Sequence, residues 1–207
     1  MPENIIDRLT ETFRRFPGIG SRQARRFVYH LLHVGHGPIE RLIADLRELT
    51  TVVAQCESCF CFYPIDHRAT KICDLCRDSG RDRNLLMIIE KDADLEAVRQ
   101  TGVYQGYFFV LGGLVPILDK DPPSTVRLRE LVNLISKRVV TKELTEIIVA
   151  LAVNPEGDHT IEFLKQALER WTKGGLRLTV LGRGLSTGTE LEYSDADTIK
   201  NALQNRS

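Results

Sequence analysis

Four cysteines are spaced for metal binding. They form two Cys-x-x-Cys pairs with thirteen residues between them, Cys56 and Cys59 followed by Cys73 and Cys76. Each pair can offer two thiolates to one ion, and four thiolates in this pattern suit a closed tetrahedral zinc site. Because four protein ligands leave no open coordination position, the expected role of zinc is structural. Cys61 and His67 lie in the same segment but are not needed as ligands. A thioredoxin-like redox role is disfavoured, since it needs a single pair at a strand–helix junction.

A second group of side chains concentrates positive charge. The segment FRRFPGIGSRQARRF (residues 13–27) carries five arginines around a Pro-Gly-Ile-Gly turn, namely Arg14, Arg15, Arg22, Arg25 and Arg26. No acidic residue occurs from Thr12 through Ile39, although the whole chain balances 28 basic with 28 acidic residues. The first N–H groups of a helix after such a turn can bind an anion, and arginines beside them add charge-assisted contacts to phosphate. This pattern predicts sequence-independent contact with a nucleic-acid backbone. The alternative is a helical hairpin with a solvated basic face.

Three carboxylates follow apolar runs typical of strands. Glu90 comes directly after residues 85–89, and Glu156 and Asp158 follow residues 147–153 in the segment AVNPEGDHT. Carboxyl ends of strands in an open α/β sheet are common ligand sites, and three carboxylates together can hold Mg²⁺. Acidic residues also end strands simply by facing water or capping helices. Both interpretations stay open, and no nucleophile with an adjacent base is recognisable.

The arginines need a helical N-terminal region to position them. Residues 1–53 are predicted to be helical, with Ser21 able to cap a helix and residues 39–49 forming a second amphipathic one. In the helix that follows the Pro-Gly-Ile-Gly turn, the side chains expected to be buried are Ala24, Phe27, Val28, Leu31 and Leu32. At 100° per residue, Arg22 and Arg26 lie opposite these side chains and Arg25 lies at their flank.

The carboxylates need a sheet to position them. Strands are predicted at 85–89, 107–111, 147–153 and 176–181, and helices at 93–101, 126–138 and 160–173. This alternation predicts an α/β fold with a mostly parallel sheet covered by helices. The longest apolar run, residues 147–153, is too short to span a bilayer, and the acidic N-terminus argues against a secretory signal. We therefore expect a cytoplasmic protein.

The order of these motifs resembles the bacterial recombination-mediator family RecR. The resemblance rests on FPGIGSRQARRFVYHLL, the four-cysteine segment, IIEKDADLEAVRQTGVYQGYFFVLGG, VNPEGDHT and GLSTGTELEYSDADTIKNAL, which together cover essentially the whole chain. It implies four parts: a helix-hairpin-helix DNA-binding and oligomerisation region (1–54), a four-cysteine zinc finger (55–78), a Toprim domain (79–182) and a C-terminal Walker B-like segment with a helix (183–207).

The resemblance also implies a function. Members of this family are non-enzymatic DNA-repair proteins that form ring-like tetramers able to encircle DNA. With RecO, and in some pathways RecF, they help to load RecA onto gapped DNA at the nucleoid. The family's DNA-contacting positions fall on Arg22 and Arg26, and its zinc ligands on the four cysteines named above. Its Toprim acidic positions fall on Glu90, Glu156 and Asp158, where partner binding is expected and RecO is the leading candidate.

Two other functions stay open at this point. A Toprim domain can carry out magnesium-dependent phosphoryl transfer or nuclease chemistry, with Glu90 as acid/base and with Glu156 and Asp158 on the metal. An interaction scaffold without DNA contact is the third interpretation, but it leaves the arginine cluster unexplained.

Overall fold

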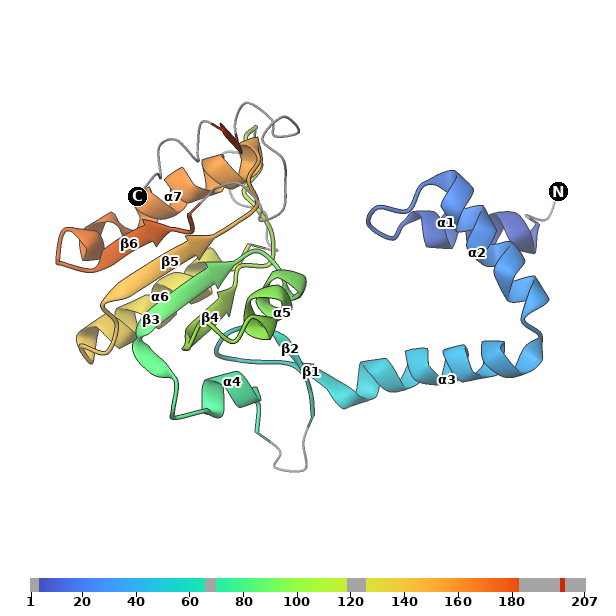
Figure 1. Ribbon diagram of the computed structural model, residues 1–207, viewed down its shortest axis with the longest axis horizontal. Helices are drawn as coiled ribbons and strands as arrows, with labels where there is room; N and C mark the ends of the chain where they lie inside the picture. Colours follow the sequence, from blue (N-terminus) through green and yellow to red (C-terminus); the bar gives the residue numbers. More distant parts are fainter. Residues whose placement is uncertain (1–3, 66–69, 119–125, 183–197, 200–207) are drawn as a thin grey trace. The chain divides into compact units, whose positions relative to one another are not determined.

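The computed structural model describes residues 4–65, 70–118, 126–182 and 198–199 (Figure 1). The chain divides into two compact units, residues 1–53 and residues 54–207. His67 and nearly all of the predicted C-terminal segment lie outside the described residues. Within the described part of the chain, no helix is both long enough and apolar enough to cross a membrane.

The first unit is helical, as predicted, and consists of three helices: α1 (Ile5–Arg14), α2 (Ser21–His33) and α3 (His36–Val52). The Asn4 side chain caps α1 by accepting a hydrogen bond from the N–H of Ile6 (3.1 Å). The prediction that Ser21 caps α2 is wrong, because Gly20 occupies the N-cap position and Ser21 is the first helical residue. Gly18 in the preceding turn has φ of 75°, a conformation that glycine adopts without strain.

Helices α1 and α2 pack as a hairpin. Ala24 and Val28 are buried, and the ring of Phe27 meets the ring of Phe13 edge to face with centroids 5.8 Å apart. The predicted burial of Leu32 is wrong, since its side chain is 63% exposed. Leu32 lies in the last turn of a thirteen-residue helix whose partner α1 has only ten residues, so little of α1 is left to cover it.

The second unit contains the predicted parallel sheet. Its strands are β3 (Asp82–Ile89), β4 (Gly106–Val110), β5 (Glu146–Ala150) and β6 (Arg177–Val180), in the spatial order β4-β3-β5-β6. All three strand pairings are parallel. The helices between them are α5 (Asp92–Gln100), α6 (Leu128–Val140) and α7 (Pro155–Thr172). The α/β fold class is confirmed.

Both faces of this sheet are buried (Figure 1). Leu86 and Ile88 of β3 belong to the core cluster that includes residues of α6 and α7. Met87 and Ile89 point the other way, into a cluster with Leu95 of α5 and the cysteine-rich segment. This two-sided burial explains why the strand reads as a continuous apolar run rather than as an alternating pattern.

The cysteine-rich segment, residues 54–78, forms what we call the cysteine knuckle. It contains two short strands, β1 (Val53–Gln55, which begins one residue earlier) and β2 (Phe62–Pro64), which pair with each other, and the short helix α4 (Asp74–Arg77). These small elements were not predicted. The knuckle covers one face of the sheet, so its cysteines belong to the core of the second unit.

Candidate metal centre and nucleic-acid interface

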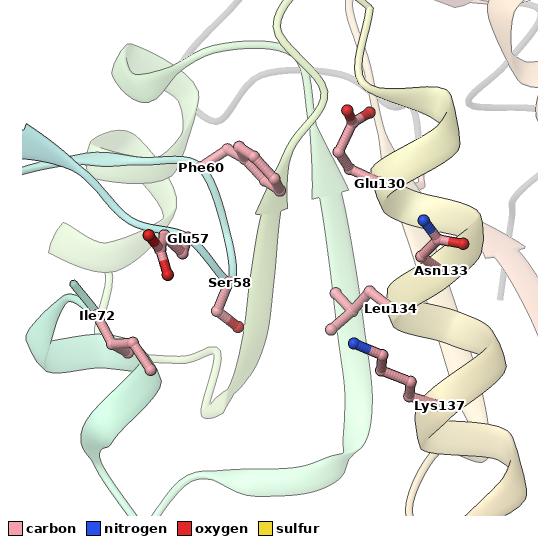
Figure 2. A pocket seen from close by; sticks show the side chains of 8 residues that line it. All are labelled: Glu57, Ser58, Phe60, Ile72, Glu130, Asn133, Leu134 and Lys137. Carbon is pink, nitrogen blue, oxygen red and sulfur yellow. The ribbon is translucent and has the colours of Figure 1, made fainter.

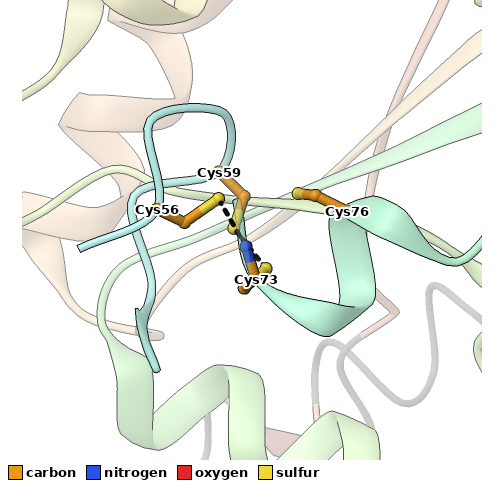
Figure 3. Close-up of side chains that lie close together, drawn as sticks. All are labelled: Cys56, Cys59, Cys73 and Cys76. Carbon is orange, nitrogen blue, oxygen red and sulfur yellow. Dashed lines mark hydrogen bonds between the residues drawn. The ribbon is translucent and has the colours of Figure 1, made fainter. Parts of the chain in front are cut away.

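The four predicted cysteine ligands come together in space. Their Sγ atoms all lie within 4.8 Å of one another. Figure 3 shows the side chains of Cys56, Cys59, Cys73 and Cys76 close together. Among the described residues, this is the only group of three or more His, Cys, Asp or Glu side chains placed closely enough to share an ion. Four converging sulfurs are a ligand set for a soft or borderline cation and not for Mg²⁺ or Ca²⁺. The cluster is therefore a candidate metal-binding site in its chemistry as well as in its spacing.

Backbone hydrogen bonds shape the knuckle around these sulfurs. The N–H of Phe60 donates to the carbonyl oxygen of Cys56 (3.0 Å), and the N–H of Cys56 donates to that of Cys61 (2.9 Å). The N–H groups of Ser58 and Cys73 each approach Cys56 Sγ at 3.4 Å. Donors aimed at a sulfur favour its thiolate form, which is the form that binds metal.

The sulfurs also act on one another's protonation. The side-chain hydrogen bond with Cys59 lowers the pKa of Cys56 to about 6. The same bond raises the pKa of Cys59, because that thiol is the one that keeps its proton. Without a metal, then, proton sharing stabilises only part of the negative charge that four thiolates would carry. A divalent cation is the natural counter-charge for this set.

The knuckle is fastened to the sheet by directed contacts. The N–H of Val110 in β4 donates to the carbonyl oxygen of Cys59 (2.8 Å), and the N–H of Phe62 donates to Asp92 Oδ1 in α5 (2.7 Å). The Phe60 ring meets the Phe109 ring with centroids 5.4 Å apart. A metal bound by the cysteines would thus hold in place the layer that covers this face of the sheet.

A groove separates the knuckle from α6. It has a volume of about 340 Å³, and Figure 2 shows side chains from both sides around a common space. The lining residues are Glu57, Ser58, Phe60 and Ile72 from the knuckle and Glu130, Asn133, Leu134 and Lys137 from α6. Sequence reasoning missed this groove because nothing in the spacing of residues shows where the knuckle docks.

The five predicted arginines divide into two kinds. Arg14 forms an ion pair with Glu11 (2.9 Å), and Arg25 forms one with Asp7 across the hairpin (3.2 Å). Arg15, Arg22 and Arg26 are exposed and have no ion pair with any residue that the structure describes. The uncompensated charge of the hairpin is therefore carried by three guanidinium groups.

The start of α2 lies after Arg15 and before Arg22 and Arg26 in the sequence. Gly20 has no side chain that could cap the helix, and the hydrogen bonding of α2 starts with the N–H of Ala24 and the carbonyl oxygen of Gly20 (2.9 Å). The preceding N–H groups of the first turn have no intrahelical partner by the geometry of the α-helix. A phosphate can accept hydrogen bonds from such groups while arginines neutralise its charge.

Sequence reasoning missed a shallow groove along α2. It has a volume of about 490 Å³ and is lined by Gln23, Arg26, Phe27, Tyr29, His30 and His33. The spacing of Arg26, His30 and His33, four and then three residues apart, places them along one side of the helix and was visible in the sequence. Both histidines are exposed, and His33 Nδ1 lies 2.6 Å from the carbonyl oxygen of Tyr29.

The three carboxylates lie where the strands β3 and β5 end. Glu90 follows β3 and is largely buried, its side chain 18% exposed, with Lys91 Nζ at 3.8 Å. Glu156 and Asp158 are exposed in the first turn of α7, where acidic side chains interact favourably with the helix dipole. Within the described part of the chain, the three carboxylates are not close enough to one another to form a set of metal ligands, as the four cysteines do.

Gly157 fixes the position of the last two carboxylates. Its N–H donates to Oδ1 of Asn154, the N-cap of α7 (2.7 Å). A Cβ atom at this position would lie 1.9 Å from the carbonyl oxygen of Ala152, so only glycine fits. Sequence reasoning gave no role to Gly157, although a glycine inside the first turn of a helix is itself a signal of close packing.

Comparison with known proteins agrees with this architecture. Family models match three stretches of the chain in succession. They are described as "RecR, helix-hairpin-helix" (residues 6–50), "Toprim domain" (residues 84–181) and "RecR, C-terminal" (residues 184–207).

Similar proteins match the chain over almost its entire length. "Recombination protein RecR" of Chlorobium limicola is 33% identical over 202 residues, which cover 98% of this chain and 96% of that protein. The protein of the same name from Mycobacterium sp. (strain KMS) is 34% identical over 206 residues, with 100% and 98% covered. The one from Legionella pneumophila (strain Philadelphia 1) is 32% identical over 206 residues, with the same coverage. Identity above 30% along the full chain, with three family models in the predicted order, shows that this chain belongs to the RecR family of recombination proteins.

Proposed function

We propose that this chain is a recombination mediator that binds DNA through its N-terminal hairpin and carries out no turnover. Membership of the RecR family supports a role in DNA recombination and repair. The observation that carries the DNA-binding part is the set of three uncompensated arginines around the uncapped start of α2: Arg15, Arg22 and Arg26.

The hairpin suits phosphate and not base edges. The two kinds of donor available at the start of α2, backbone N–H groups and guanidinium groups, both match phosphate oxygens. In the proposed complex, Arg22 and Arg26 contact successive phosphates while the Gly18–Gly20 turn lets the strand approach the backbone closely. Binding of this kind is independent of sequence and weakens as salt rises.

The metal that we propose for the cysteine cluster is zinc. Cys56, Cys59, Cys73 and Cys76 would hold it, and it would supply a structural cross-link rather than a reactive centre. The knuckle packs on β4 and α5, so this cross-link stabilises the Toprim sheet that carries the acidic positions.

We further propose that several copies assemble into a ring-like tetramer that encircles DNA. One hairpin with three free guanidinium groups supplies few phosphate contacts, and several copies acting together multiply them. Helix α3 supports self-association, because Leu42, Leu46, Leu49 and Val52 are all exposed along it and no residue of α3 is buried. An exposed apolar face of this length is suited to burial against a second copy.

In this proposal the acidic positions recruit partner proteins. Glu156 and Asp158 are exposed at the carboxyl end of the central strands, where the largely buried Glu90 also lies. The exposed pair would offer negative charge to RecO, with RecF a partner in some pathways. The assembly would then help to load RecA onto gapped DNA coated by single-strand-binding protein.

A second candidate function is magnesium-dependent phosphoryl transfer. The Toprim match over residues 84–181 and the place of Glu90 at the end of β3 favour it. In that case Glu90 would act as acid/base, and wild-type protein would cut or extend DNA when Mg²⁺ is present.

The test of DNA binding is a double variant, Arg22→Ala with Arg26→Ala. At low salt its affinity for a labelled oligonucleotide, measured by fluorescence anisotropy, should fall at least about tenfold, since two guanidinium groups no longer bind phosphate. The matched control is Arg83→Ala, which removes an exposed arginine of the second unit that pairs with Glu143 (3.1 Å). Unchanged affinity in the double variant, with fold and zinc content intact, defeats the proposal.

A further inference from the structure

A fifth thiol lies beside the four-cysteine cluster. Cys61 is only 4% exposed, and its Sγ lies 3.3 Å from the Sγ of Cys59. The residue between Cys59 and Cys61, Phe60, has φ of 64°, and the bend of the chain there brings the two sulfurs close together.

We propose that Cys61 is a reserve ligand of the zinc site, which replaces Cys76 when the Cys76 thiolate leaves the metal. This inference rests on the proposed zinc site and is independent of DNA binding. Sequence spacing alone assigns no role to Cys61, so the claim comes from where the structure places its sulfur.

Cys76 is the most exposed of the four ligands. It is only half-buried, whereas the other three ligands are buried. It also stands on α4, a helix of four residues, so a small displacement of α4 would carry its sulfur away from the other three.

Cys61 is well placed to take over. The sulfurs of Cys56, Cys59 and Cys73 stay within 4.8 Å of one another without Cys76, and Cys61 lies beside one of them. Its backbone is held by the hydrogen bond from the N–H of Cys56 to its carbonyl oxygen (2.9 Å). A movement of the Cys61 sulfur toward the sulfurs of Cys56 and Cys73 would therefore complete a second set of four thiolates without unfolding the knuckle.

The exchange is a ligand substitution and involves no oxidant. A Zn–S bond to Cys76 breaks and its thiolate takes up a proton from water. A Zn–S bond to Cys61 forms and the Cys61 thiol releases a proton to water. Zinc stays divalent throughout, and the net charge of the site is unchanged.

The direct test compares three variants of the full-length chain: Cys76→Ser, Cys61→Ser and the double variant. Zinc per chain is measured by mass spectrometry, and the number of bound thiolates is read from the visible and near-ultraviolet spectrum after substitution with Co²⁺. Cys76→Ser should keep one metal ion with a four-thiolate spectrum. The double variant should show a three-thiolate spectrum and an affinity lower by about tenfold or more. If Cys76→Ser already matches the double variant, or the wild type binds no zinc, the proposal is wrong.

A second measurement covers the case in which Cys76→Ser does not fold. Zinc transfer from the otherwise unchanged protein to a chelator should be about tenfold faster in Cys61→Ser than in the wild type, because the reserve thiol no longer retains the ion when Cys76 detaches. Cys61→Val keeps an apolar side chain at the buried position and should be equally fast. Release at the wild-type rate in both variants overturns the reserve-ligand role, and fast release in Cys61→Ser alone would show a packing effect and overturn it too.

Discussion

Replacing Gly157 by alanine tests how the loop that carries the acidic positions is built. The added Cβ would lie 1.9 Å from the carbonyl oxygen of Ala152 and 3.3 Å from Asn154 Oδ1, the atom that caps α7. The backbone of this loop must therefore move, and the hydrogen bond between the Gly157 N–H and Asn154 Oδ1 is broken or distorted.

The expected loss of stability combines three contributions. Losing an N-cap costs about 1 kcal/mol, and forcing an extra methyl group into a packed site costs about 1–3 kcal/mol. Alanine regains about 0.5–1 kcal/mol as a better helix former than glycine. The free energy of unfolding of Gly157→Ala should thus fall by about 1–3 kcal/mol, a decrease in Tm of roughly 2–12 °C for a chain of this size.

The assay uses the single tryptophan of the chain. Trp171 lies near the end of α7, so its fluorescence during thermal or urea unfolding reports on the helix whose start is altered. The matched control is Gly182→Ala, since a Cβ there meets no atom within 4 Å, and its stability should stay within about 0.5 kcal/mol of the wild type. If Gly157→Ala is as stable as this control, the close contact with Ala152 is not a feature of the folded protein.

Three more predictions follow from the sites. The slope of the logarithm of DNA affinity against the logarithm of salt concentration should become shallower in Arg22→Ala and in Arg26→Ala. The expected change is about 0.9 for each duplex phosphate that the variant no longer neutralises. The slope should hardly change in Arg14→Ala, because the Arg14 guanidinium already pairs with a glutamate. Cys73→Ser combined with Cys61→Ser leaves three thiolates, so this double variant should lose zinc and lower the Tm of the second unit. Full zinc content and an unchanged Tm in the double variant would contradict the four-thiolate site. Glu90→Gln should leave the fold and the DNA affinity unchanged in an assay with Mg²⁺. If the wild type cleaves DNA in the presence of Mg²⁺ and this variant does not, the enzymatic alternative is established.

The parts of the fold that depend on local pattern were predictable from sequence. The strands around residues 85–89 and 107–111 are apolar runs that only burial on both faces of a sheet explains, and the structure buries them in this way. The meeting of the four cysteines was predictable as well, since two Cys-x-x-Cys pairs in a short segment can converge on one ion.

The features that depend on distant contacts were not predictable. Whether an arginine is free depends on which acidic side chain the hairpin brings to it, and Asp7 reaches Arg25 only because α1 folds back on α2. The exposure of Leu32 depends on the difference in length between those helices. The approach of Cys61 to Cys59 depends on the bend at Phe60, a left-handed conformation that residue type alone does not indicate.

The central claim is that several copies of the basic hairpin bind one DNA backbone at the same time. Light scattering of the purified wild-type chain, coupled to size-exclusion chromatography with and without an oligonucleotide at low salt, tests it most directly. We expect a mass of more than one subunit and co-elution with the DNA, with complexes that dissociate as salt is raised. A single subunit that elutes apart from the DNA at every salt concentration would contradict the account.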